Sequence, residues 1–211
     1  CGCAGKLVAL HPEFDVTGVD FGTNMEYCRQ HYPFGQWIEA DFESTKELPL
    51  TPEKLRNSVV VCSDVIEHLM SPDALLKLIQ SLLEHAPLAL VSTPERNLTW
   101  GYLHNGLPPN PCHVREWSLK ELTGLLKSRG FDILKAGLTV SHSQSPEKMT
   151  IFTALAGKTL SAESRASVDA ELPDAGTPMG YIAQALRRTW RCTWIIRCGC
   201  RRNMSRITKS S

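Results

Sequence analysis

Two histidines, His68 and His113, carry the side chains that best suit proton transfer, because an unperturbed imidazole has a pKa near 6.5. His68 lies in the run DVIEHL. Here the acidic residues Asp64 and Glu67 and the histidine stand at positions i, i+3 and i+4. One helical turn would place these three side chains on a common face. The spacing therefore predicts a cluster of two carboxylates and an imidazole, with His68 and His113 as candidate catalytic bases.

Three aspartates close three successive predicted strands. Asp20 ends the run DVTGVD, Asp41 follows QWIEA, and Asp64 comes shortly after SVVVC. Ligands of open α/β sheets bind at the carboxyl ends of the strands, where a carboxylate can accept hydrogen bonds from ribose hydroxyls or an adenine amino group. Gly2 and Gly5 lie in the opening CGCAG, before a predicted helix, and could present backbone N–H groups to the same ligand.

The elements that must position these residues alternate between short apolar runs and helical patterns, which is typical of βαβ units. Strands are predicted at Asp15–Asp20, Gln36–Ala40, Ser58–Cys62, Leu88–Ser92, Phe131–Gly137 and Thr150–Leu155, and helices at Thr23–His31, Pro72–His85 and Ser118–Ser128. The last two strands flank a predicted hairpin loop, which favours an antiparallel edge on an otherwise parallel sheet. A long loop is expected from Thr93 to Pro111.

The composition hides a strong charge asymmetry. The 211 residues are 42% hydrophobic with a net charge of +1, which fits one globular domain with its own core. Residues 180–211 hold eight basic and no acidic groups, whereas residues 1–179 hold 15 basic and 22 acidic groups, a net charge of −7. No apolar run is long enough for a membrane-spanning helix, so a cytoplasmic protein with reduced cysteines is expected.

The C-terminal part divides into a linker and a basic tail. The periodic pattern stops at Gly157, which predicts a linker over residues 158–179 and a separate tail over 180–211. Apolar residues recur in this tail every four positions, at Ile182, Leu186, Trp190 and Trp194. A basic amphipathic helix of this kind suits an anionic membrane surface. A helix that docks on a partner and a segment foreign to the domain are the alternatives.

Several of these motifs resemble class I S-adenosylmethionine-dependent methyltransferases over residues 1–157. The resemblance rests on the glycine loop with Ala4, on the strand ends GVD and EAD, on DVIEHL and on STP. DVIEHL and HVREWSLKEL are similar to the subgroup of ubiquinone-pathway O-methyltransferases and small-RNA 2′-O-methyltransferases. The family resemblance implies a doubly wound, mostly parallel, seven-stranded Rossmann-like sheet. The family's first strand, normally central, would lie upstream of Cys1, so the chain is expected to be a fragment.

The same resemblance assigns the cofactor contacts. The residues matched to S-adenosylmethionine binding are Gly2, Ala4, Asp20, Asp41, Asp64 and Val65. By this match the glycine loop lies against the methionine part of the cofactor, Asp20 holds the ribose and Asp41 contacts the adenine.

A divalent metal is a further implication. In the small-RNA methyltransferases, the acids and histidine that match Asp64, Glu67 and His68, together with a later histidine before an E-W pair, hold a metal that engages acceptor hydroxyls. The later residue here is His113. Two carboxylates and two imidazoles could hold Mg²⁺ or Mn²⁺ with open positions. The alternative is that Glu67 and His68 line the cofactor pocket or cap a helix without a metal.

The resemblance predicts methyl transfer to an acceptor, with an oxygen of a small molecule or glycan-related substrate expected. Trp100, Tyr102 and His104 could form the acceptor pocket. The acidic body argues against a long nucleic-acid partner, whose phosphates would need a basic track. An NAD-dependent dehydrogenase of Rossmann type and an inactive module that binds a cofactor or partner are the alternatives, and the oligomeric state is left open.

Overall fold

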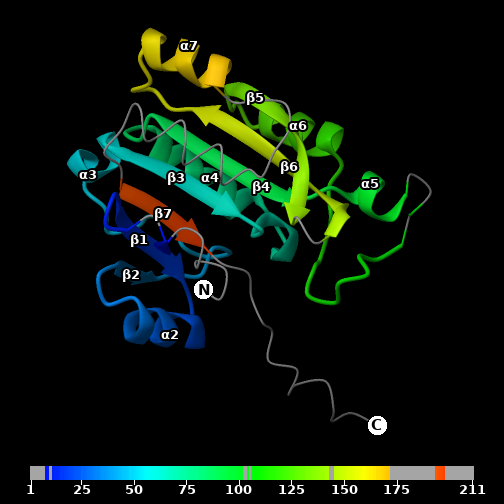
Figure 1. Ribbon diagram of the computed structural model, residues 1–211, viewed down its shortest axis with the longest axis horizontal. Coiled ribbons are helices and arrows are strands. Elements are labelled where there is room, and N and C mark those ends of the chain that lie inside the picture. The colour runs from blue at the N-terminus through cyan, green and yellow to red at the C-terminus, as the bar shows by residue number, and fades with distance from the viewer. Residues whose placement is uncertain are drawn as a thin grey trace.

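A mixed sheet of seven strands, in the order β2-β1-β7-β3-β4-β6-β5, positions the rest of the molecule (Figure 1). The computed structural model describes residues 8–9, 11–101, 104, 106–142, 145–171 and 193–197. The strands are β1 (Asp15–Asp20), β2 (Gln36–Glu39), β3 (Ser58–Ser63), β4 (Leu88–Pro94), β5 (Ile133–His142), β6 (Ser145–Ala156) and β7 (Thr193–Arg197). The helices are α2 (Thr23–His31), α3 (Pro52–Arg56), the 3₁₀ turn η1 (Ile66–His68), α4 (Asp73–Leu83), α5 (Arg96–Trp100), α6 (Leu119–Ser128) and α7 (Ala162–Glu171).

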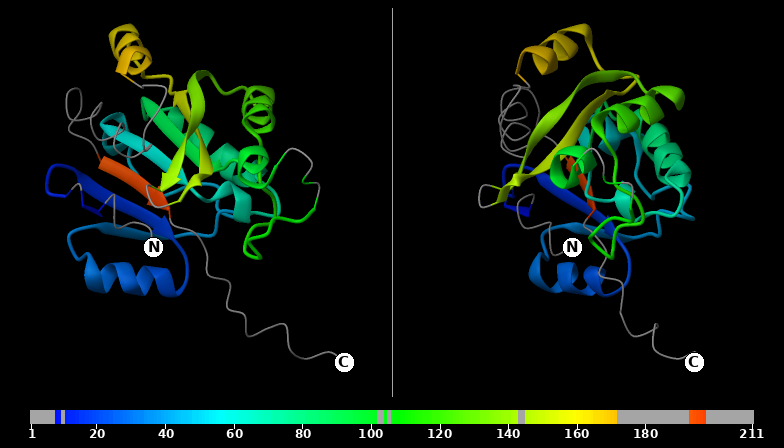
Figure 2. Two further views of the ribbon diagram at one scale, coloured as in Figure 1. Left: turned by 45° about the vertical axis from the view of Figure 1, so that its right-hand side comes forward. Right: turned by 90° about the vertical axis from the view of Figure 1, so that its right-hand side faces the viewer.

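Apolar side chains on both faces of the sheet explain why helices cover it on two sides. In β3, Val60 and Cys62 belong to one core cluster, whereas Val59 and Val61 belong to another. The first cluster contains the apolar faces of α4 and α6, which lie on one side of the sheet (Figure 2). The second includes Cys28 of α2 and is contacted by Val168 of α7. This is the expected doubly wound α/β arrangement.

The antiparallel edge predicted from the sequence is confirmed. β6 pairs antiparallel with both β4 and β5, whereas the pairs β1–β2, β1–β7, β3–β7 and β3–β4 are parallel. β5 and β6 are longer than the predicted strands, because the polar residues expected to form the hairpin loop continue the ladder as far as His142 and Ser145.

The C-terminal segment differs from the helix expected there. Residues Thr193–Arg197, including Trp194, form β7, which lies in parallel between β1 and β3. Three of its five residues are β-branched, and such residues favour strands. This preference outweighs the spacing of four between the aromatic residues, which favours a helix. β7 thus occupies the central position at which the resemblance expects the family's first strand. That a first strand lies upstream of Cys1 stays a prediction, and Ile182, Leu186 and Trp190 lie outside the described residues.

Two short helices lie where loop or linker was expected. α5 interrupts the predicted loop Thr93–Pro111, and the side chain of Glu95 caps it by accepting the N–H of Leu98 at 2.6 Å. α7 lies within the predicted linker, where Ser161 Oγ accepts the N–H of Ser164 at 3.1 Å. In the part of the chain that the structure describes, no helix is both long and apolar enough to cross a membrane.

Candidate functional site

The candidate site begins at the carboxyl end of β3, where the chain turns sharply at Asp64. This exposed residue has a φ of 53°, and its N–H donates to the carbonyl of Ser92 on β4 at 3.0 Å. The left-handed region is rare for residues with a Cβ, but aspartate tolerates it better than most. Glu67 and His68 lie in η1 after this turn. The prediction that Asp64 shares their helical face is therefore wrong, because its backbone is not helical.

Glu67 is a fully buried carboxyl group beneath the site. Its Oε2 accepts a hydrogen bond from Thr93 Oγ1 at 2.8 Å, whereas its Oε1 has no hydrogen-bond partner among the described residues. Burial, followed by the nearby negative charge of Asp64, raises the pKa of Glu67 to about 8. A buried carboxyl group with a free oxygen is a group that a cation or a proton would stabilise.

The two predicted bases lie together above this carboxyl group. The rings of His68 and His113 are nearly perpendicular, with their centroids 4.8 Å apart. The Nδ1–H of His68 donates to the carbonyl of Cys112 at 2.8 Å, because a carbonyl can only accept. Its Nε2 lies 3.8 Å from Glu67 Oε1. In the sequence α4, β4 and α5 separate these histidines, and the fold returns His113 to η1.

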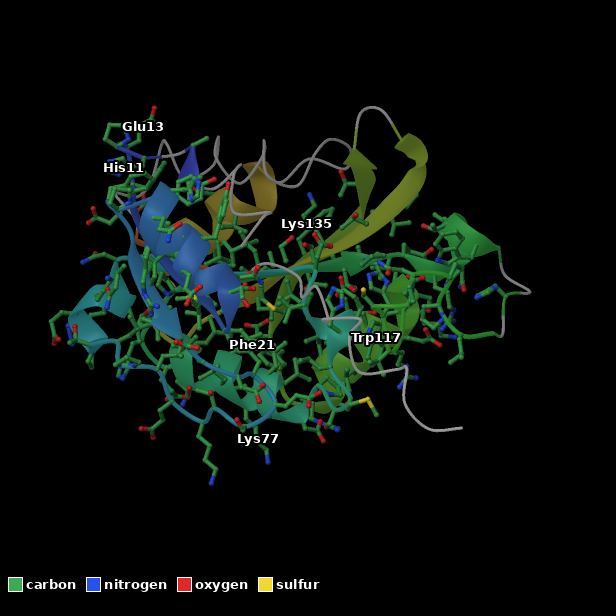
Figure 3. The ribbon with its side chains drawn as sticks, turned by 90° about the horizontal axis from the view of Figure 1, so that it is seen from below. His11, Glu13, Phe21, Lys77, Trp117 and Lys135 are labelled. Carbon is green, nitrogen blue, oxygen red and sulfur yellow. The ribbon has the colours of Figure 1, made fainter. Side chains whose placement is uncertain are left out.

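Residues 113–117, here called the strap, bring His113 to this position. The N–H groups of Val114 and Arg115 both donate to the carbonyl of Glu67, at 2.7 and 3.2 Å. Farther along lies Trp117 (Figure 3). It is buried, and its carbonyl accepts the N–H of Arg96 at 2.9 Å. The strap is thus fastened at one end to η1 and at the other to the start of α5.

The strap leads into a capping box at the start of α6. Ser118 Oγ accepts the N–H of Glu121, and the Glu121 side chain accepts the N–H of Ser118. Glu121 also pairs with Arg96 of α5, with the closest N–O distance at 2.9 Å. Burial would raise the pKa of Glu121, but the hydrogen bonds from Ser118 and Arg96 outweigh it and hold the pKa below its ordinary value.

Three of the four predicted metal ligands come together. One candidate ligand atom from each of Glu67, His68 and His113 lies within 4.8 Å of the others, and Asp64 is not part of this group. The donor set of one carboxylate and two imidazoles suits a divalent transition metal. Because Glu67 Oε1 is buried without a hydrogen-bond partner among the described residues, this set fits a metal ion.

The predicted cofactor residues that the structure describes lie at the carboxyl ends of their strands or shortly after them. Asp20 is fully buried, and its carboxylate accepts the N–H of Phe21 at 2.9 Å and the Asn24 side-chain amide at 3.3 Å. Asp41 is exposed after β2 and accepts the N–H of Glu43 at 3.0 Å. Val65 is buried before η1. Gly2 and Ala4 lie outside the described residues.

The predicted acceptor residues are only partly described. Trp100 is 38% exposed, and its indole N–H donates to Glu116 Oε2. His104 lies on the loop beyond α5, where its Nε2 contacts the carbonyl of Leu107 at 3.2 Å. Tyr102 lies outside the described residues. Trp100 is therefore connected to the histidine cluster through Glu116.

Sequence reasoning missed two residues that complete the site. Thr93 holds Glu67, and it is the first residue after the predicted strand Leu88–Ser92. Glu116 is buried, and its Oε1 accepts the Nδ1–H of His113 at 2.6 Å. Its position three residues after His113 was visible as part of HVREW, but spacing alone does not show that the two side chains meet.

Comparison with known proteins identifies the fold and its relatives. A family model described as a methyltransferase domain matches residues 2–136. A protein of Mycobacterium tuberculosis named "Probable S-adenosylmethionine-dependent methyltransferase" is 35% identical over 125 residues, which are 58% of this chain and 43% of that protein. A similarly named protein of Mycolicibacterium smegmatis is 33% identical over 119 residues, 56% of this chain and 44% of its own length. The chain thus spans less than half the length of these curated relatives.

Two solved structures share the fold at low sequence identity. An S-adenosylmethionine-dependent methyltransferase from Methanosarcina mazei has a TM-score of 0.50 and 15% identity, over 75% of this chain and 87% of that one. The cyclase SpnF also has a TM-score of 0.50, with 14% identity over 74% and 71% of the two chains. Because one of these proteins is named a cyclase, the fold by itself does not determine the reaction.

The family follows from the sequence match rather than from the fold alone. The matched residues 2–136 make up more than half of the chain and include β1 to β4, η1, the strap and α6. They also contain the motifs DVIEHL and HVREW, which form the histidine cluster. The chain therefore belongs to the class I S-adenosylmethionine-dependent methyltransferases.

Proposed function

We propose that this chain transfers the methyl group of S-adenosylmethionine to an oxygen of a small-molecule or glycan-related acceptor. The observation that carries the proposal is the pair of imidazoles, 4.8 Å apart, at the carboxyl end of β3 in a methyltransferase sheet. A hydroxyl acceptor must lose its proton as it takes the methyl group, and imidazole is the side chain best suited to remove it near neutral pH. The family match favours neither a dehydrogenase nor a binding module without turnover.

The hydrogen bonds of His68 indicate which atom would accept the proton. Its Nδ1–H donates to the carbonyl of Cys112, so the neutral ring has its lone pair on Nε2. This nitrogen faces Glu67 Oε1. A hydroxyl held near this pair could pass its proton to Nε2.

The cofactor would lie along the carboxyl ends of β1 to β3. Bound S-adenosylmethionine supplies an electrophilic methyl group, and the remaining work of the protein is to align the acceptor oxygen with it. We assign the ribose to Asp20 and the adenine to the neighbourhood of Asp41. Trp100 and His104 would border the acceptor.

A divalent metal is part of the same proposal. Glu67, His68 and His113 would hold it; with its Nε2 bound to the ion, His68 would no longer accept the proton, and the ion itself would favour the ionised form of an acceptor hydroxyl, whose proton would pass to solvent. Because two of the three donors are imidazoles, we expect Mn²⁺ to bind more tightly than Mg²⁺, which prefers all-oxygen sites.

The test is acceptor-dependent formation of S-adenosylhomocysteine by the full chain, with a panel of hydroxylated metabolites and glycans. His68→Ala should lower kcat by about 10²-fold or more while the Kd for S-adenosylmethionine, measured by calorimetry, stays unchanged. His31→Ala, at the exposed end of α2, is the matched control and should leave both values unchanged.

Chelation tests the metal separately. EDTA should reduce turnover, and Mn²⁺ should restore it. Full turnover in EDTA would remove the metal from the proposal but keep the methyl transfer. Binding of NAD instead of S-adenosylmethionine, or cofactor binding with no turnover on any acceptor, would contradict the proposed function.

A further inference from the structure

Glu116 lies behind His113 and uses both of its carboxylate oxygens. Its side chain is 1% exposed; Oε1 lies 2.6 Å from His113 Nδ1, and Oε2 accepts the indole N–H of Trp100. Burial would raise the pKa of Glu116, but the hydrogen bonds from His113 and Trp100 outweigh it and hold the pKa below its ordinary value. With one oxygen on the imidazole of His113 and the other on the indole N–H of Trp100, Glu116 connects the strap to α5.

This contact determines where the neutral imidazole of His113 carries its proton. A carboxylate only accepts hydrogen bonds, so Nδ1 must carry the hydrogen that Oε1 receives. The lone pair then lies on Nε2, which accepts a hydrogen bond from the side-chain amide of Asn110 at 2.9 Å. Because the carbonyl of Cys112 has the same effect on His68, Nε2 is the nitrogen with the lone pair on both imidazoles, and on His113 a proton or a metal ion would have to replace the amide of Asn110.

We propose that Glu116 is a positioning residue that acts through His113, holding it in the tautomer with Nε2 unprotonated and tying it, through Trp100, to α5. A carboxylate behind an imidazole fixes both the ring orientation and the basic nitrogen, and it increases the affinity of that nitrogen for a proton or a metal. The expected effect on catalysis rests on the proposed function, whereas the expected tautomer of His113 does not. The link to Trp100 means that a change in α5 reaches His113 through a single side chain.

The first experiment needs neither turnover nor a variant. Nitrogen-15 NMR of the histidine-labelled full chain, in chelator, reports which ring nitrogen carries the proton. We expect His113 to show protonated Nδ1 and unprotonated Nε2. Protonation of Nε2 in the neutral ring would overturn the proposal whatever the enzyme's activity, and this separates its failure from a failure of the proposed function.

The second experiment compares Glu116→Gln with Glu121→Gln. Glutamine keeps the size of Glu116 but cannot accept from both His113 and Trp100, so we expect a mixed or reversed tautomer. We also expect about 10- to 100-fold weaker Mn²⁺ binding by calorimetry, the usual loss when a partner behind a metal-binding histidine is removed. Glu121 is the matched control, because it is buried less, serves the capping box and Arg96, and makes no contact with His113.

Catalysis provides the third readout. Glu116→Gln should lower kcat with little change in the KM for S-adenosylmethionine, whereas Trp100→Phe, which leaves the His113 contact in place, should retain the wild-type tautomer. Circular dichroism and thermal unfolding confirm that each variant is folded. If Glu116→Gln and Glu121→Gln change the tautomer and Mn²⁺ affinity to the same extent, Glu116 is only structural and the proposal is wrong.

Discussion

Glu67 is a fully buried carboxyl group with one oxygen bonded to Thr93 and the other without a hydrogen-bond partner among the described residues. Such a group costs free energy unless a proton, a cation or a polarised hydroxyl compensates it. The two imidazoles beside it are the groups that can exchange protons with it or share a metal with it. The unfavourable environment of Glu67 is thus best explained by the chemistry proposed for the site.

This environment predicts a pH dependence of stability. The pKa of Glu67 rises from an ordinary value of 4.5 to about 8 in the folded chain. Between these values the folded state keeps a proton that the unfolded state releases, so the free energy of unfolding falls as the pH rises. In Glu67→Gln this fall in the free energy of unfolding is absent, because glutamine does not titrate. Urea unfolding in chelator should show the variant gaining stability relative to wild type from about pH 5 to about pH 8.

Glu121→Gln is the control for this series. The pKa of Glu121 is lowered, so its contribution is present above its ordinary pKa and is lost only as the pH falls through the lowered value. The difference between this variant and wild type should therefore stay constant over the same range. A stability difference between Glu67→Gln and wild type that does not change with pH would contradict the assigned environment of Glu67.

The sequence predicted which site residues carry the chemistry better than it predicted their geometry. The approach of His113 to Glu67 and His68 was expected from the family resemblance and is found. The separation of Asp64 from these three residues was not expected. It depends on one left-handed φ after β3, which an i, i+3, i+4 pattern does not reveal. The role of Glu116 could be recognised only from the three-dimensional path of the strap.

At the scale of helices and strands, local sequence patterns predicted an element correctly where tertiary packing favours the same structure. β1 and α2 have the predicted bounds, and α6 differs from the predicted helix Ser118–Ser128 only by beginning at Leu119. α7 was missed because few of its residues are apolar, and β7 because the spacing of its aromatic residue also fits a helix. Each miss is a short segment whose structure depends on what it packs against.

Two glycines in elements near the core allow a sharp comparison. A Cβ on Gly157, just after β6, would overlap the backbone carbonyl of Ala86, whereas a Cβ on Gly124 in α6 would meet nothing within 4 Å. Gly157→Ala should therefore lower the free energy of unfolding by about 1–3 kcal/mol. Gly124→Ala should raise it by about 0.5–1 kcal/mol, because glycine is unfavourable within a helix. Urea unfolding measures both, and equal effects of the two substitutions would contradict this packing.

At the scale of the whole molecule, the sheet consists of two groups of strands joined by β7. One group is β1 and β2, and the other is β3, β4, β5 and β6. Among the described residues, the strand pairing that connects the groups passes through β7, which pairs with Thr17 and Gly18 on one side and with Val60 and Val61 on the other. The proposed cofactor residue Asp20 and the histidine cluster belong to different groups, so their relative position depends on this strand.

Ile195→Pro tests whether β7 holds the two groups together. Every N–H of a central strand bonds to one neighbour or the other, so proline there removes a ladder hydrogen bond and should cost about 3 kcal/mol or more. Hydrogen exchange should then show β1 losing protection more than β4 and β6, because β1 keeps only its pairing with β2, whereas β4 and β6 each keep a neighbour on both sides. Ala166→Pro, within α7, is the matched control, because it breaks a peripheral helix and should leave the protection of β1 unchanged. Equal protection of β1 in wild type and Ile195→Pro would mean that β1 is held to β3 by something other than β7, and the central position of this strand would have to be abandoned.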